Sequence, residues 1–170
     1  MITGHNSIIL IGPMKAGKTT VGKLLAKEVT CPFVSLDSHD TRYMQAVGFD
    51  PSNTSYDYSR SYFDEAVVRF VDEFEGVLEL GGGHPIVPDP VKQTRICKVL
   101  EPFPNVVFLT PSSDPKLALH VLQERRGDRP TGWDWLGWNR KFLGSQVFHE
   151  LAKIVIYTLD KTPEEACGEI

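Results

Sequence analysis

Residues 12–20 read Gly12-Pro13-Met14-Lys15-Ala16-Gly17-Lys18-Thr19-Thr20 and fit G-x-x-x-x-G-K-[ST], the phosphate-binding P-loop. The apolar run Ile8-Ile9-Leu10-Ile11 before the motif predicts a buried strand, and apolar spacing after it predicts a helix from about Lys18 to Val29. A strand-to-helix turn is the context that the motif requires, because backbone N–H groups and the helix N-terminus then face phosphate oxygens. The stretch therefore predicts a binding site for ATP.

Each residue type in the motif suits a step in holding a nucleotide. We expect Lys18 to reach the β- and γ-phosphates and the Thr19 hydroxyl to bind Mg²⁺. Glycine lets the backbone curl around the phosphates, which explains the residues at both ends of the loop. The full set of expected nucleotide-binding residues is Gly12, Pro13, Met14, Lys15, Ala16, Gly17, Lys18, Thr19 and Thr20, although Lys15 also suits a solvated position.

Bulk composition is that of one ordinary globular domain spanning residues 1–170. Hydrophobic residues make up 41% and charged residues 24%, and the net charge of −4 leaves no electrostatic footprint for nucleic acid. The apolar runs are too short for a membrane span, and the N-terminus shows no signal-peptide pattern. Cys31, Cys97 and Cys167 form no C-x-x-C pair. We therefore expect a cytoplasmic protein with a small-molecule substrate and no nucleic-acid or membrane partner; the oligomeric state stays open, with a monomer favoured.

Strands and helices are expected to alternate along the rest of the chain. Further apolar runs predict strands at 33–36, 77–80, 106–109 and 154–157, and helices are expected at about 59–74, 90–100, 115–124 and 139–153. Thr162-Pro163-Glu164-Glu165 is a capping box that opens a last helix. Residues 38–58 and 125–137 show no regular period. Continuous apolar strands separated by helices predict a three-layer, doubly wound α/β domain with a five-stranded parallel sheet.

At this point the chain resembles the shikimate kinases, within the P-loop small-molecule kinases. The resemblance rests on the P-loop wording, Leu80-Gly81-Gly82-Gly83, Asp37, Arg60 and Arg129-Pro130. It implies a fold similar to the nucleoside-monophosphate kinases, with a lid at about residues 125–138. It also implies transfer of the γ-phosphate of ATP to a hydroxyl of shikimate or a similar carboxylated metabolite.

The resemblance also implies roles for single residues. Asp37 would contact the acceptor hydroxyl, Arg60 would bind the substrate carboxylate, and Gly81, Gly82 and Gly83 would line the acceptor pocket. In the lid, Arg129 would contact the substrate and neutralise the transferring phosphate, and Arg125 or Arg126 would lie against adenine. The predicted catalytic residues are thus Lys18, Asp37 and Arg129.

Plainer readings of these residues stay open. Asp37 could merely cap the segment that follows it, and Arg60 could form a surface pair with Asp64 at i+4. His84 is expected at the pocket rim. The three tryptophans, Trp133, Trp135 and Trp138, could fix the lid to the following helix or close over the acceptor.

Three departures from the family pattern leave the acceptor open. Ser35 stands where the family has the first of two acids, and Gly144 stands where a second substrate arginine is expected, with Arg140 one helical turn too early. The lid continues from Arg129-Pro130 with Thr131-Gly132-Trp133 instead of aliphatic residues. The alternatives are a P-loop switch or ATPase module that acts through a protein partner, a gluconate kinase, or a nucleotide kinase. The last would need a base-reading site, and residues 38–58 carry Arg42 as their one arginine.

Overall fold

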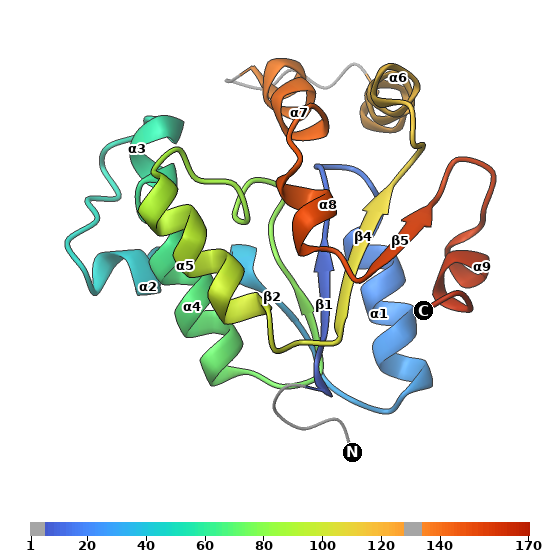
Figure 1. The fold of residues 1–170 in the computed structure, drawn as a ribbon, viewed down its shortest axis with the longest axis horizontal. Coiled ribbons are helices and arrows are strands. Elements are labelled where there is room, and N and C mark those ends of the chain that lie inside the picture. The colour runs from blue at the N-terminus through green and yellow to red at the C-terminus, as the bar shows by residue number, and fades with distance from the viewer. Residues whose placement is uncertain (1–5, 128–133) are drawn as a thin grey trace.

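A five-stranded parallel sheet organises the computed structural model, which describes residues 6–127 and 134–170 (Figure 1). The strand order is β2-β3-β1-β4-β5. The strands are β1 (Ile8–Ile11), β2 (Phe33–Ser35), β3 (Val77–Glu79), β4 (Asn105–Thr110) and β5 (Ile154–Tyr157). The expected five-stranded sheet is confirmed, and β1, which leads into the P-loop, is its central strand.

Helices cover both faces of the sheet. Their bounds are α1 (Lys18–Glu28), α2 (Asp40–Gln45), α3 (Tyr56–Arg60), α4 (Phe63–Glu73), α5 (Pro90–Leu100), α6 (Pro115–Arg126), α7 (Trp135–Leu143), α8 (Val147–Leu151) and α9 (Pro163–Cys167), with one 3-10 turn, η2 (Leu36–Ser38). Figure 1 shows α1 and α9 beside one face and α2, α4 and α5 beside the other. Helices α6 and α7 lie beyond the carboxyl ends of the strands, over the P-loop edge.

Alternating side chains of the strands build two separate cores. Ile9 and Ile11 of β1 belong to a core with α4, α5 and α8, whereas Leu10 belongs to a second core with α1 and α9. Strands β1 and β4 are buried almost throughout, because helices cover both faces of the parallel sheet. The outcome is the expected three-layer domain, which holds the carboxyl ends of the strands at one edge.

Helix starts follow the expected capping chemistry. Asp89 accepts hydrogen bonds from the backbone N–H groups of Val91 and Lys92, and Pro90 is the first residue of α5. Thr162 and Glu165 form the capping box of α9, as predicted. No helix in the described ranges is both long enough and apolar enough to cross a membrane.

Several helix boundaries were predicted wrongly. The single helix expected at 59–74 is two helices, α3 and α4, and the one expected at 139–153 is α7 and α8, interrupted at residues 144–146. Residues 38–58 contain α2 and the start of α3, although no period is visible there. Such helices of five or six residues are too short to show a period, and α2 is held by its buried Tyr43 and Met44.

Candidate active site

The P-loop takes a backbone path that its two glycines permit. Gly12 has a φ of 142° and Gly17 a φ of 102°. A Cβ atom added at Gly12 would lie 2.2 Å from the backbone oxygen of Leu109 on the neighbouring strand β4. Only glycine therefore fits at position 12, where the loop turns against the sheet.

Lys18 is held inside this loop. Its side chain is buried, and its Nζ donates to the carbonyl oxygens of Gly12 at 3.0 Å and Pro13 at 3.2 Å. Burial lowers the pKa of Lys18, although the nearby charges of Glu79 and Asp37 oppose that effect. The ammonium group is thus already directed into the concave side of the loop, where a phosphate would lie.

Thr19 and Glu79 form a contact that sequence reasoning missed. The Thr19 hydroxyl donates to Glu79, with Oε1 at 2.8 Å and Oε2 at 3.0 Å. Glu79 is only 4% exposed and ends β3, beside β1. The one sequence signal is an acid within the apolar run Val77-Leu78-Glu79-Leu80, a run that by itself predicts only a buried strand. Hydroxyl and carboxylate oxygens are ligands that Mg²⁺ accepts, so the pair fits the predicted metal site.

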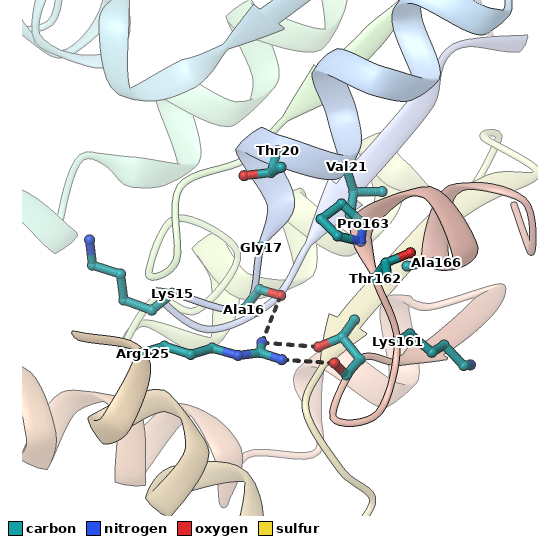
Figure 2. Close-up of a pocket in the computed structure, with 11 residues that line it drawn as sticks. Lys15, Ala16, Gly17, Thr20, Val21, Arg125, Lys161, Thr162, Pro163 and Ala166 are labelled. Atoms are coloured by element: carbon teal, nitrogen blue, oxygen red, sulfur yellow. Dashed lines mark hydrogen bonds between the residues drawn. The ribbon is translucent and has the colours of Figure 1, made fainter. Parts of the chain in front are cut away.

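A cavity of about 290 Å³ opens beside the loop (Figure 2). It is lined by Lys15, Ala16, Gly17, Thr20, Val21, Arg125, Thr158, Lys161, Thr162, Pro163 and Ala166. Arg125 donates to the Thr158 hydroxyl at 3.1 Å and to its carbonyl at 2.7 Å, and also approaches the Ala16 carbonyl at 3.5 Å. Half-buried space between a P-loop and an arginine suits a nucleotide base.

The two predicted adenine arginines occupy different places. Arg125 lines the cavity, whereas the guanidinium of Arg126 lies 5.0 Å from the centre of the Trp135 ring on α7. The loop between β5 and α9 supplies the far wall of the cavity. From the sequence, this loop is predicted only to cap the last helix. Arg129 lies outside the described residues, as does Trp133.

Asp37 and the triple glycine meet at the same edge of the sheet. Asp37 lies in η2, directly after β2. A Cβ atom at Gly81 would lie 2.0 Å from Asp37 Oδ1, and one at Gly82 would lie 2.6 Å from Met14 Cγ of the P-loop. A Cβ atom at Gly83 would lie 2.0 Å from the Tyr56 hydroxyl. Side chains at these three positions would fill the space between Asp37 and the P-loop.

Arg60 is buried at the end of α3, and Tyr56 of the same helix lies near both Arg60 and Asp37. Arg60 is 8% exposed and donates through Nη2 to the Ile86 carbonyl at 3.1 Å. Its guanidinium lies 4.7 Å from the centre of the Trp138 ring, and its Nε has no hydrogen-bond partner among the described residues. A guanidinium has five donors, so Arg60 keeps capacity for a carboxylate at its terminal nitrogens.

The surface-pair reading of Arg60 is wrong. Asp64 pairs with Arg95 at 2.9 Å and lies 3.7 Å from Lys92. The one carboxylate recorded near Arg60 within the described ranges is Asp57, at 3.6 Å and exposed.

His84 is buried beneath Asp37 instead of standing at the rim. Its Nε2 lies 3.2 Å from Asp40 Oδ2, and its ring centre lies 4.3 Å from that of Phe63. Its Nδ1 lies 3.6 Å from Asp37 Oδ1 and has no hydrogen-bond partner among residues 6–127 and 134–170. Burial raises the pKa of Asp40, but the hydrogen bonds from His84 and Thr41 outweigh it and lower that pKa overall.

Asn139 joins α7 to the P-loop. Its fully buried amide donates to the Met14 carbonyl at 3.2 Å and accepts from the Met14 N–H at 3.1 Å. Trp135 of the same helix is buried in the second core, and Trp138 packs against Tyr56 with ring centres 4.6 Å apart. These two tryptophans thus fix α7 to the domain. Asn139 could not be predicted from the sequence, because a single amide in a helix has no distinctive pattern.

Comparison with known proteins identifies the family. The family model for shikimate kinase matches residues 14–170. A shikimate kinase of Enterococcus faecalis is 29% identical over 174 residues, which cover 96% of this chain and 95% of that protein. One of Pseudomonas fluorescens is 31% identical over 166 residues, covering 92% of this chain and 89% of that protein.

Solved structures confirm the fold. The shikimate kinase of Acinetobacter baumannii in complex with shikimate has a TM-score of 0.67 at 22% identity, over 96% of this chain and 89% of that one. A gluconokinase of Sinorhizobium meliloti has a TM-score of 0.59 at 18% identity, over 98% of this chain and 89% of that one. The fold alone does not separate the two kinases, because both resemble this structure at similar identity. The shikimate kinase family model, by contrast, matches nearly all of the chain. This chain belongs to the shikimate kinase family.

Proposed function

We propose that this protein transfers the γ-phosphoryl group of ATP to a hydroxyl of shikimate. The observation that carries the proposal is that Asp37 lies within electrostatic reach of Lys18, while Tyr56 lies near both Asp37 and Arg60. A cation inside the P-loop, a carboxylate near it and a buried arginine are the groups that a carboxylated alcohol and a triphosphate need. Family membership supports the same reaction.

Phosphoryl transfer requires positioning and charge stabilisation more than strong acid or base chemistry. Lys18 would exchange its contacts with the loop carbonyls for oxygens of the β- and γ-phosphates. Asp37, exposed in the middle of η2, would orient the acceptor hydroxyl and accept its proton late in the transfer. Arg60 would hold the carboxylate of the acceptor and so fix which hydroxyl faces the nucleotide. The chemistry that Mg²⁺ supplies in such sites is charge neutralisation at the β- and γ-phosphate oxygens.

A coupled assay of ADP release tests the proposal. Purified protein with ATP and Mg²⁺ should release ADP slowly alone and much faster with shikimate, with gluconate and a panel of hydroxy acids as comparison acceptors. Stimulation by gluconate and not by shikimate would assign the reaction to the other kinase class. If no acceptor stimulates a protein that binds ATP, the kinase proposal fails.

We further propose that residues 1–170 form one working domain, which uses ATP with Mg²⁺. We propose that the protein acts in the cytoplasm and that it is a monomer. Arg129 remains the proposed lid arginine. Light scattering after size-exclusion chromatography measures the assembly state directly, and a stable dimer peak would contradict the monomer.

A further inference from the structure

Glu79 is a buried carboxyl group without a close cationic partner among residues 6–127 and 134–170. Among the described residues, the Thr19 hydroxyl is the one hydrogen-bond donor to its carboxylate, and no lysine, arginine or histidine nitrogen lies within 4.0 Å. Removing a carboxylate from water is costly unless a cation or several donors compensate. One neutral hydroxyl shared by both oxygens is little compensation, so the site has capacity for a cation.

Lys18 lies near Glu79, but its ammonium group makes its hydrogen bonds to other groups. It attracts Glu79 electrostatically, yet its Nζ donates to the Gly12 and Pro13 carbonyls. Glu79 also lines a cavity of about 410 Å³ together with Lys18, Thr19 and Arg125. The carboxylate thus faces the space in front of the P-loop, where nucleotide phosphates and their metal ion would lie.

The register of the sheet places Glu79 beside Ser35. Glu79 of β3 pairs with Ser35 of β2 and with Leu10 of β1. Paired residues of adjacent parallel strands direct their side chains to the same face. Position 35 is where the chain lacks the acid that its family resemblance leads one to expect. Glu79 lies in register with that position, one strand closer to the P-loop.

We propose that Glu79 and Thr19 together hold the Mg²⁺ of the bound nucleotide, with Glu79 supplying the carboxylate that position 35 does not. Magnesium sites of this kind use one or two carboxylates, substrate phosphates and waters, so one buried acid and one hydroxyl satisfy the protein's share. Their present hydrogen bond keeps both oxygen ligands in place before metal arrives. This inference rests on the proposed use of ATP and assigns a residue to its metal.

The test measures metal binding without turnover. Mn²⁺ is titrated into protein saturated with ADP, and free Mn²⁺ is followed by its electron paramagnetic resonance signal. Glu79→Gln should weaken Mn²⁺ binding about 10-fold or more, because it replaces a charged ligand by an amide of equal size. The double variant Glu79→Gln with Ser35→Asp should recover much of the affinity, since the acid returns on the paired strand.

Matched measurements separate this role from a structural one. Glu101→Gln alters an exposed acid that follows α5, at the opposite edge of the sheet, and should leave Mn²⁺ binding unchanged. Nucleotide affinity in EDTA should not fall in Glu79→Gln, and circular dichroism checks the fold. Should that variant fail to fold, Glu79→Asp keeps the charge, shortens the reach and should still weaken Mn²⁺ binding.

Three results would count against the inference. Wild-type Mn²⁺ affinity in folded Glu79→Gln or Glu79→Asp would reduce Glu79 to a support for Thr19. A double variant as weak as Glu79→Gln would contradict the placement argued from the register. A wild-type protein that binds no ADP at all would instead overturn the proposed function, which keeps the two failures distinct.

Discussion

Replacing Arg60 by alanine should raise the KM for shikimate far more than the KM for ATP. The two terminal nitrogens of Arg60 keep hydrogens for a ligand: Nη2 makes one hydrogen bond, to the Ile86 carbonyl, and Nη1 has only the exposed Asp57 at 3.6 Å among the described residues. A fork-shaped, charge-assisted contact from Nη1 and the second hydrogen of Nη2 to a carboxylate is worth about 2 kcal/mol. At about 1.4 kcal/mol per factor of ten, its loss corresponds to a roughly 30-fold higher KM.

The same substitution should also lower thermal stability. Arg60 loses its hydrogen bond to the Ile86 carbonyl and its stacking on Trp138, each worth about 1 kcal/mol. For a domain of this size, about 2 kcal/mol lowers Tm by roughly 4–8 °C. Arg60→Lys retains the charge and the stem but not the fork, so its KM for shikimate should lie between those of the wild type and Arg60→Ala.

Steady-state kinetics with one substrate varied and the other saturating measure the two effects separately. Arg69→Ala is the matched control, because Arg69 lies on the exposed side of α4 and pairs with Glu65 at i,i+4. It should change neither KM. Equal increases in both KM values, or an unchanged KM for shikimate in Arg60→Ala, would refute the carboxylate role.

Four further outcomes are expected. Lys18→Ala should cut turnover roughly 10²-fold or more while circular dichroism stays the same, because it removes a cation from the transferring phosphate; near-normal turnover would contradict the P-loop role. Asp37→Asn should lower kcat while ATP affinity, measured by calorimetry, is kept; the reverse pattern would remove Asp37 from the acceptor side. Gly12→Ala should weaken nucleotide binding about 10-fold or more, since its Cβ would lie 2.2 Å from a backbone oxygen at a strained φ; Gly168→Ala, whose Cβ would find ordinary contacts at 3.6 Å, is the control. Tryptophan fluorescence should change when shikimate binds, because Trp138 stacks on Arg60; a Trp138→Phe variant that keeps the whole signal would assign it to another indole.

The sequence predicted the parts of the site that have fixed local chemistry. The P-loop needs glycines and a lysine at set spacings, and buried parallel strands need unbroken apolar runs, so both were found from the residues alone. The strand ends then placed Asp37 and Gly81 at one edge of the sheet. Family resemblance added Arg60, which the structure buries at the end of α3.

The residues that were missed act through tertiary contacts. Glu79 looks like a strand residue until β3 is placed beside β1 and its carboxylate meets Thr19. His84 was expected at the rim, yet Asp40 and Phe63 hold it under Asp37. Neither neighbour is close to it in sequence, so no local pattern could have placed the imidazole.

The two hydrogen bonds between Asn139 and Met14 have a consequence for folding during protein synthesis. They join residues 125 positions apart, and the adjacent strand β4 is likewise made long after the loop. At a synthesis rate of roughly 5–20 residues per second, the nascent P-loop waits about 6–25 s for the amide that fixes its backbone. ATP should therefore bind late on the ribosome, and a stalled chain that ends before α7 should present its glycine-rich loop to chaperones without a nucleotide to protect it.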